Sequence, residues 1–224
     1  WLAPLEQSAT LVDAAGRPTH RAAMSLLEAR VADGVAVAGS RARAHWLDAA
    51  PTTTHHGSGR DGVAVPAGLL TVFSLLRGPW EARLVRVDAL ADGVDAGALT
   101  LRLGGWPLVG TGASVLPEGD GVATGATTST LRALVGTGRP AVSSRQGASP
   151  LGDPAHVPTL TFPVRVGAWV AALVGLSGAV PTHEERTSRA ELLERDGGLD
   201  AVVTWPDGVR TSTHLSVEAP GNAA

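Results

Sequence analysis

The chain has 224 residues and a formal net charge of −3, and it contains no cysteine, so neither a disulfide framework nor a cysteine-ligated metal site is available to it. All 18 basic residues are arginine, but lysine, isoleucine and tyrosine are missing altogether. The preference for arginine therefore follows from the overall composition and is weak evidence for phosphate or carboxylate binding. The slightly acidic balance and the lack of any arginine run argue against nucleic acid as a partner.

No apolar segment is long enough to span a membrane. The longest apolar windows, such as residues 166–176, are far shorter than the ~20 residues of a spanning helix. No basic stretch followed by an apolar one opens the sequence, so no signal peptide is visible and a cytoplasmic location is favoured. Because the chain begins at Trp1 rather than methionine, we expect residues 1–224 to be one domain cut from a longer protein.

The N-terminal part predicts β-strands. Residues 5–12 and 22–31 are strand candidates, separated by a turn-rich segment at 13–18. Residues 23–30 also favour helix. We prefer strand, since Asp33-Gly34 follows at once and Asp-Gly between two runs is a strong hairpin signal.

The return limb of that hairpin, residues 35–47, alternates in character. One set of positions holds the polar side chains and the other holds small or aromatic ones: Arg41, Arg43 and His45 against Ala42, Ala44 and Trp46. Because successive side chains of a strand point to opposite faces, we expect one polar, cationic face and one packed face.

Residues 63–90 read as two long strands joined by a tight turn at Arg77-Gly78-Pro79. The first limb is almost continuously apolar over 69–76, which predicts a strand in the middle of a sheet. The second limb changes its apolar parity near Leu84-Val85. A β-bulge or a passage from one packing partner to another would produce that change.

The C-terminal half predicts further strands and one short helix. A strand covers 98–103, and residues 110–126 and 136–158 read as loops rich in glycine. Residues 128–135 predict a helical turn, with Thr128 or Ser129 as N-cap and Gly136 as C-cap.

After this turn, residues 159–166 and 168–176 predict a strand pair around Gly167. The last strand candidates cover 189–195, 199–205 and 209–217, the final two joined by a turn at Pro206-Asp207-Gly208. Many short strands with Gly/Pro turns and little helix indicate an all-β fold, an antiparallel β-sandwich.

Histidine and carboxylate residues give no complete site. His55-His56 could bind a metal or a sugar hydroxyl, but neighbouring side chains point apart and no spaced ligand set completes a metal site. We expect no cofactor, since no nucleophile elbow or nucleotide-binding loop has its required context. The remaining acids and histidines read as surface groups, among them Glu81, Asp88, Asp61, Glu118, His20, His156, His183 and His214.

Six tryptophans stand out, since the other aromatic residues are two phenylalanines. Tryptophan rings can stack on sugars, but tryptophan is also the largest core residue, and a core position is favoured for most of them. Trp46 is the exception, because it ends a strand with a cationic face and leads directly into the His55-His56 loop.

Several of these segments, in this order, resemble a known family. They are Ser40-Arg41 with His45-Trp46, His56-Gly57-Ser58-Gly59-Arg60, residues 78–87, residues 146–152 with Pro158, and Trp205-Pro206-Asp207-Gly208. The succession resembles the C-terminal domain of the bacterial family called domain of unknown function 2264. Its members look like carbohydrate-active enzymes with an (α/α) toroid followed by a supersandwich-like β-domain. They are similar in architecture to heparinase II/III-type lyases and are placed among glycoside hydrolases acting on glucuronides.

The resemblance implies that this β-domain packs on a toroid of the same chain, which carries most of the catalytic cleft. We therefore expect no catalytic residue in this domain, and the residues themselves predict no metal site. The residues expected at the rim of that cleft, facing an acidic glycan, are Trp46, His55, His56, Arg60 and Gln146. Arg60 suits a uronate, because a guanidinium can hold a carboxylate by two bonds. A stand-alone carbohydrate-binding module and a purely structural interaction domain remain open, as does hydrolase or lyase chemistry in the parent protein.

Overall fold

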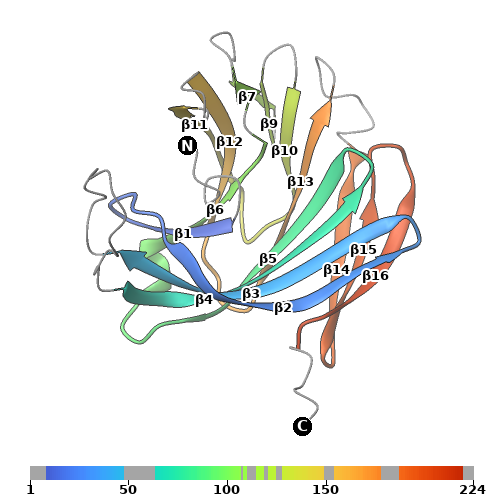
Figure 1. Ribbon diagram of the computed structural model, residues 1–224. Coiled ribbons are helices and arrows are strands. Elements are labelled where there is room, and N and C mark those ends of the chain that lie inside the picture. Colours follow the sequence, from blue (N-terminus) through green and yellow to red (C-terminus); the bar gives the residue numbers. More distant parts are fainter. Residues whose placement is uncertain are drawn as a thin grey trace, which may run out of the picture.

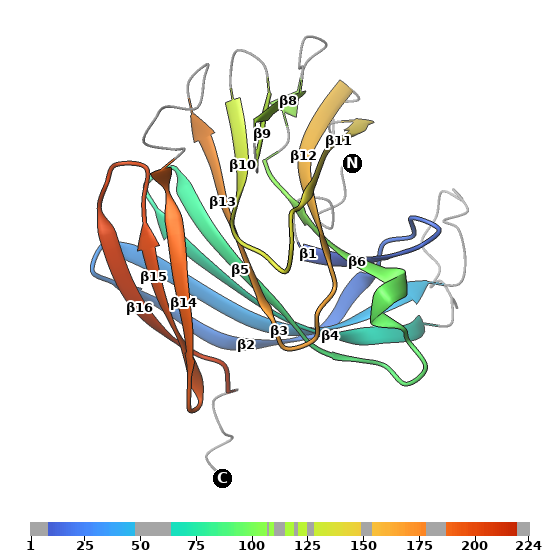
Figure 2. The ribbon, with the colours of Figure 1, turned by 180° about the vertical axis from the view of Figure 1, so that it is seen from behind.

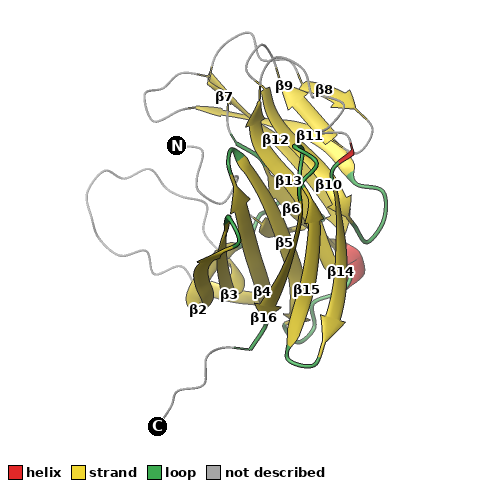
Figure 3. Cartoon of the chain, turned by 90° about the vertical axis from the view of Figure 1, so that its right-hand side faces the viewer, coloured by secondary structure: helices red, strands yellow, loops and turns green. Residues whose placement is uncertain are grey.

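Most of the described chain is β-strand (Figure 1). The computed structural model describes residues 9–47, 64–106, 108–109, 115–118, 121–124, 128–148, 154–177 and 187–218. The strands form three sheets in which the paired strands are antiparallel, and a short 3-10 helix, η1 (Ala96–Ala98), precedes one of them. Figure 3 shows how far strands dominate the described segments. The prediction of an antiparallel all-β fold is confirmed.

An eight-stranded sheet forms the centre of the molecule (Figure 1). Its strands, in spatial order, are β2 (His20–Ala32), β3 (Val35–Leu47), β4 (Ala64–Arg77), β5 (Trp80–Leu90), β13 (Trp169–Ser177), β10 (Thr128–Val135), β9 (Gly121–Thr124) and β8 (Val115–Glu118). One region that was expected to be a loop, residues 110–126, therefore contains strands, namely β8 and β9.

Two smaller sheets lie on either side of the large sheet, as seen from behind in Figure 2. The five-stranded sheet contains β1 (Ala9–Asp13), β6 (Leu99–Gly104), β12 (Pro154–Pro163) and β11 (Ala141–Ala148), in that order, with β7 (Leu108–Val109) also paired to β12. The three-stranded sheet contains β14 (Arg189–Arg195), β15 (Gly198–Thr204) and β16 (Arg210–Ser216).

Each smaller sheet buries one core against the large sheet. The first core joins the five-stranded sheet to the large one and includes Leu11, Leu103 and Phe162 beside Leu70 and Val85. The second core joins the three-stranded sheet to the opposite face. It is built from Phe73, Leu84, Trp169, Leu199 and Trp205, together with smaller neighbours. Full burial of a leucine or phenylalanine contributes about 1.5–3 kcal/mol, so the two cores dominate the stability of the fold.

The hairpin of β4 and β5 lies where these two cores meet. β4 pairs with β3 on one side and with β5 on the other, which confirms its mid-sheet position. Ala82 and Leu84 belong to the second core, whereas Val85 and Val87 belong to the first. The register of β4 and β5 shifts between Leu69 and Leu70, opposite Val87 and Ala89, and not at Leu84-Val85. The change of apolar parity is therefore a change of packing partner, the second of the two expected explanations.

The hairpin of β2 and β3 forms as predicted. Asp33 and Gly34 have φ angles of 52° and 74°, the left-handed backbone that a two-residue type I′ turn requires. Residues 23–30 lie within β2, so strand was the correct choice over helix. Two register irregularities interrupt β2, between Ala22 and Ser25 and between Leu26 and Glu28.

Two expectations for the C-terminal half were wrong. Residues 128–135 form β10, which pairs with β13, and not a helical turn. The physical reason is alternation: Leu131 is fully buried in the first core while Leu134 packs on the second. Local helix propensity yielded to burial on two faces of a sheet. Residues 136–158 are likewise not one irregular loop, because β11 and the start of β12 lie in them.

The expected strand pair around Gly167 was also wrong, although both strands exist. β12 pairs with β6, β7 and β11, whereas β13 pairs with β5 and β10. The turn at Gly167, where φ is 80°, carries the chain from the five-stranded to the eight-stranded sheet. The last three strand predictions are confirmed as β14, β15 and β16.

Candidate functional site

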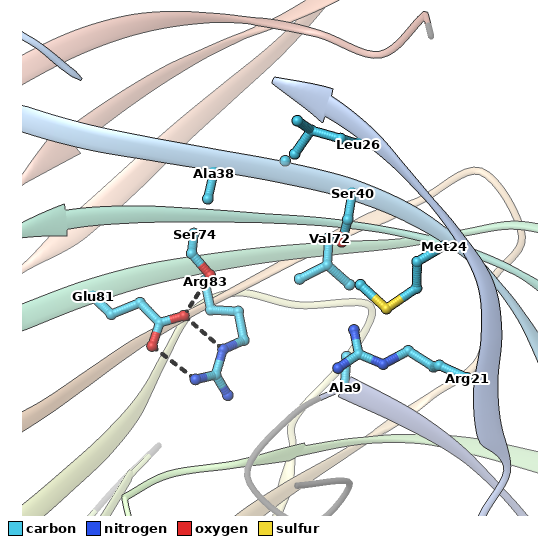
Figure 4. A pocket seen from close by; sticks show the side chains of 11 residues that line it. Ala9, Arg21, Met24, Leu26, Ala38, Ser40, Val72, Ser74, Glu81 and Arg83 are labelled. Atoms are coloured by element: carbon cyan, nitrogen blue, oxygen red, sulfur yellow. Dashed lines mark hydrogen bonds and ion pairs between the residues drawn. The ribbon is translucent and has the colours of Figure 1, made fainter. Parts of the chain in front are cut away.

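A pocket of about 390 Å³ lies on the face of the large sheet that also carries the first core. Its polar lining comes from β2, β3, β4 and β5 and consists of Arg21, Ser40, Ser74, Glu81 and Arg83. Its apolar lining includes Ala9, where β1 begins, and Met24 and Leu26 on β2 (Figure 4). The pocket therefore combines charged groups with an apolar wall.

An ion pair forms one side of this pocket. The Nε and Nη2 atoms of Arg83 donate to the two carboxylate oxygens of Glu81 at 2.8 and 2.7 Å. Ser74 Oγ donates to the same carboxylate at 2.7 Å, and Arg83 Nη1 donates to the carbonyl of Gly104 at 2.6 Å. Glu81 is 5% exposed and Arg83 8%. A bidentate pair with additional partners is the arrangement in which a buried charge pair is held in one geometry.

The charge on Glu81 is stabilised by its partners. Burial raises the pKa of the Glu81 carboxyl, but the hydrogen bonds and positive charge of Arg83, helped by Ser74, outweigh it, so the pKa lies below its ordinary value. Glu81 is thus ionised at neutral pH. The expectation that Glu81 is a surface charge is wrong, since its carboxylate is buried and paired.

Arg21 is different, because the described residues offer it no carboxylate. The register of β2 and β3 sets Arg21 opposite Ala44, a residue of the first core, so its side chain lies on the pocket face. Its guanidinium makes no hydrogen bond or ion pair with any described residue. Burial, and then the positive charge of Arg83, lower the pKa of Arg21. The pocket thus holds two guanidinium groups and one carboxylate.

The apolar wall is built by an irregular part of β2. Ala23 has a φ of 46°, which is uncommon for a residue other than glycine, and it lies within the first register irregularity of the strand. Met24 and Leu26 are 60% and 63% exposed. Exposed large apolar side chains beside a polar pocket are typical of contact surfaces for ligands or partners.

A second pocket of about 470 Å³ lies near the other end of β3. Arg43 and His45 line it together with Pro66, Leu69 and Leu90. The expected polar face of β3 is therefore present, and Ala42 and Ala44 on the alternate positions are buried. Within the described segments, no group of three or more His, Cys, Asp or Glu residues is arranged to hold a metal ion.

The structure describes only some of the residues expected at the rim of the catalytic cleft. Trp46 on β3 packs partly buried against the first core, and its buried Nε1 has no hydrogen-bond partner. His55, His56 and Arg60 lie outside the described residues. Gln146 is opposite His156 in the pairing of β11 with β12, although its side chain is not described. Trp46 and Gln146 belong to different sheets.

The pocket was not predicted from the sequence, yet one signal for it was present. Glu81 and Arg83 are two residues apart in β5, so they share a face, and that face becomes apolar at Val85 and Val87. Opposite charges at this spacing, next to core positions, indicate a buried ion pair. Nothing in the local sequence marks Arg21, because only the order of the strands β2-β3-β4-β5 in the large sheet brings it to the pocket.

The fold of this chain is similar to part of several solved structures of heparan sulfate lyases and heparinase. The solved structure of a heparan sulfate lyase HepC mutant from Pedobacter heparinus matches with a TM-score of 0.59 and 11% identity, over 96% of this chain and 30% of the lyase. The unmutated enzyme gives a TM-score of 0.58 over the same shares, at 11% identity. Heparinase III gives 0.58 with 12% identity, over 93% of this chain and 29% of that one.

These likenesses concern the fold. This chain spans about 30% of the length of the lyase structures it matches. No family model and no curated protein sequence matches it. In the described part of the chain, no helix is long and apolar enough to cross a membrane.

Proposed function

We propose that this chain is the accessory β-domain of a larger bacterial carbohydrate-active enzyme and packs against an (α/α) toroid that supplies the catalytic residues. The observation that carries the proposal is the coverage: almost the whole chain aligns with less than a third of a heparan sulfate lyase. The reaction we favour is glycoside hydrolysis of a glucuronide, with polysaccharide lysis as the alternative.

Glu81 and Asp88, the two acids of β5, are engaged by neighbouring residues and do not form a catalytic pair. Glu81 is bound by Arg83 and Ser74, while Asp88 accepts hydrogen bonds from Arg86 at 2.6 Å and from Thr71 at 2.6 Å. Glu81 and Asp88 are seven residues apart on β5, so they face opposite sides of the sheet. A glycosidase needs two carboxyl groups about 5–10 Å apart in one cleft, and these two do not meet that need.

The rim of the cleft is the contribution we assign to this domain. Trp46, His55, His56, Arg60 and Gln146 are the proposed rim residues, and an acidic glycan is the proposed ligand. In the protein with its toroid region, Arg60→Ala should raise KM for an acidic sugar substrate far more than for a neutral one. Arg210→Ala on β16 is the matched control. Equal effects of Arg60→Ala on both substrates would contradict the rim assignment.

Activity on aryl glucuronides and uronate polysaccharides tests the main proposal. We expect turnover by the longer protein that includes the toroid and none by residues 1–224 alone. Turnover by this chain alone would overturn the proposal and require two catalytic carboxylates within it.

A stand-alone carbohydrate-binding module is the second candidate, and the 390 Å³ pocket is the observation that favours it. Ligand pockets commonly measure about 300–1,000 Å³. Such a module would bind glycans without any toroid. Titration of residues 1–224 with oligosaccharides, followed by tryptophan fluorescence, would report it, and Trp106, 41% exposed, is a suitable reporter.

A further inference from the structure

We propose that the pocket between Arg21, Arg83 and the β2 side chains Met24 and Leu26 binds a single oxyanion, a carboxylate or a sulfate ester, carried on a body with an apolar face. Trp46, the proposed rim residue whose side chain the structure describes, does not line this site, and the site needs no toroid. It therefore holds or fails independently of the proposed function.

The charged groups described in the pocket have an excess of one positive charge, which one bound negative charge would neutralise. Glu81 neutralises Arg83 through two hydrogen bonds, at 2.8 and 2.7 Å. Arg21 has no such partner among the described residues, so the described part of the lining carries a net charge of +1. A partly desolvated cation without a counterion is unfavourable, and a bound anion would remove that cost.

The environment of Arg21 also favours a bound anion. Burial and the neighbouring Arg83 both disfavour its charged form, as the lowered pKa shows. Because Glu81 neutralises Arg83, the excess positive charge of the described lining lies on Arg21, and a bound oxyanion would interact most favourably there.

The pocket surface that carries Arg21 also carries a hydroxyl donor. Ser40 on β3 lines the pocket, and its hydroxyl has no hydrogen-bond partner among the described residues. Figure 4 shows Arg21 reaching into the pocket from β2 while Arg83 is held by Glu81 on the opposite side. The fork of Arg21 and the hydroxyl of Ser40 can together donate to the oxygens of a carboxylate or sulfate.

The apolar wall determines what carries the anion. Met24 and Leu26 are more than half exposed and line the pocket beside the charged groups. An inorganic ion would leave them in water, whereas the apolar face of a sugar ring or an alkyl chain would cover them. Each buried methylene contributes roughly 0.8 kcal/mol, close to a fourfold change in Kd.

Calorimetric titration of residues 1–224 tests the site. The probes are D-glucuronate, hexanoate, sodium sulfate and the neutral methyl glucoside. We expect glucuronate and hexanoate to bind at least about fivefold more tightly than sulfate, and the glucoside to show no binding under the same conditions. Equal affinity for the glucoside and glucuronate would overturn the proposal, as would the absence of binding by both organic anions.

Three variants locate the binding. Arg21→Gln should weaken the binding of both organic anions roughly tenfold or more, because it removes charge-assisted hydrogen bonds. Arg43→Gln removes the same charge from the alternate face of the sheet and should leave the affinity unchanged. Leu26→Ser should reduce the affinity for hexanoate several-fold more than the affinity for sulfate. Equal affinities of the Arg21→Gln and Arg43→Gln proteins would refute the site.

Loss of structure would not mimic these results. Since the charged form of Arg21 is disfavoured in the fold, Arg21→Gln should unfold at the same or a higher denaturant concentration than the wild type. Arg21→Lys keeps the charge without the fork and should retain part of the affinity.

Discussion

The guanidinium of Arg86 lies over the indole ring of Trp169, with its Cζ atom 4.8 Å from the ring centroid. The two residues are opposite each other on β5 and β13, and both donate to the same Glu194 oxygen of β14, at 3.0 and 2.9 Å. This contact ties the three-stranded sheet to the large sheet through a cation–π pair and a shared carboxylate.

Replacing Arg86 should loosen that connection. Arg86→Met removes the cation–π contact and the 2.6 Å hydrogen bond to Asp88, which is 11% exposed in its side chain. We expect a loss of about 1–3 kcal/mol in the free energy of unfolding, measured by chemical denaturation. Arg210→Met is the control, because Arg210 and Glu191 are both 61% exposed and their pair should contribute less than about 0.5 kcal/mol. Similar losses in the two proteins would contradict the assignment.

Breaking the ion pair in the pocket should destabilise the fold. Glu81→Leu leaves the buried guanidinium of Arg83 without its carboxylate, and a loss of about 3–5 kcal/mol is expected. Glu81→Gln keeps an oxygen for Arg83 and Ser74 and should cost clearly less. Denaturant midpoints of the two variants decide the point, and a Glu81→Leu protein as stable as the Gln variant would show that Arg83 finds another counterion.

Acid should destabilise the fold through its paired carboxylates. For Glu81, the raising effect of burial is outweighed by Arg83 and Ser74, so its folded pKa lies below its ordinary value of 4.5. For Asp13, the backbone N–H of Arg17 is the largest cause of a pKa below 3.8. A carboxyl whose pKa is lower in the folded state stabilises the protein above its unfolded pKa, and this stability is lost as the pH falls through the folded value.

The free energy of unfolding should therefore be level above about pH 5 and decrease as the pH is lowered below about 4.5. Urea denaturation at a series of pH values measures it. Glu81→Gln should flatten part of that decrease, because it removes one titrating group. A decrease of unchanged steepness in this variant would assign the acid sensitivity to other carboxyls.

Glycine opposite an aromatic ring is a requirement of the large sheet. Gly39 on β3 pairs with Phe73 on β4, and a Cβ atom at Gly39 would lie 2.3 Å from Phe73 Cε1. Gly39→Ala should cost about 1–3 kcal/mol, since Phe73 is fully buried and must shift. Gly138→Ala is the control, because its added Cβ would meet only Pro163 Cγ at 3.8 Å. In a Phe73→Leu background the cost of Gly39→Ala should shrink, and an undiminished cost would exclude the ring as its cause.

Strong local signals made much of the fold predictable. Asp33-Gly34 predicted one hairpin, and the parity change at Leu84-Val85 left a β-bulge or a change of packing partner open, of which the second is observed. Residues 128–135 were predicted as helix because β10 pairs with β13, which is distant in the sequence, and the local sequence gives no sign of that pairing. The same reason explains the false strand pair around Gly167, since adjacency in sequence does not say that a turn changes sheets.

Predicting the pocket would have required still more knowledge of which distant strands pair. Glu81 and Arg83 are close in sequence, but the burial that turns them into a site comes from neighbouring strands. Arg21 is 60 residues or more from both, and only the order β2-β3-β4-β5 brings them to one surface. Three of the predicted rim residues lie outside the described segments, so the rim assignment remains a prediction.

Strands β4 and β5 send alternate side chains into both cores, so neither layer is an independent folding unit. If one smaller sheet detaches, the apolar side chains on that face of β4 and β5 meet water, and the wall that supports the other core weakens. Unfolding should thus be a single cooperative transition. The amide protons of β4 and β5 should exchange with solvent most slowly, at the rate set by global opening of the whole domain.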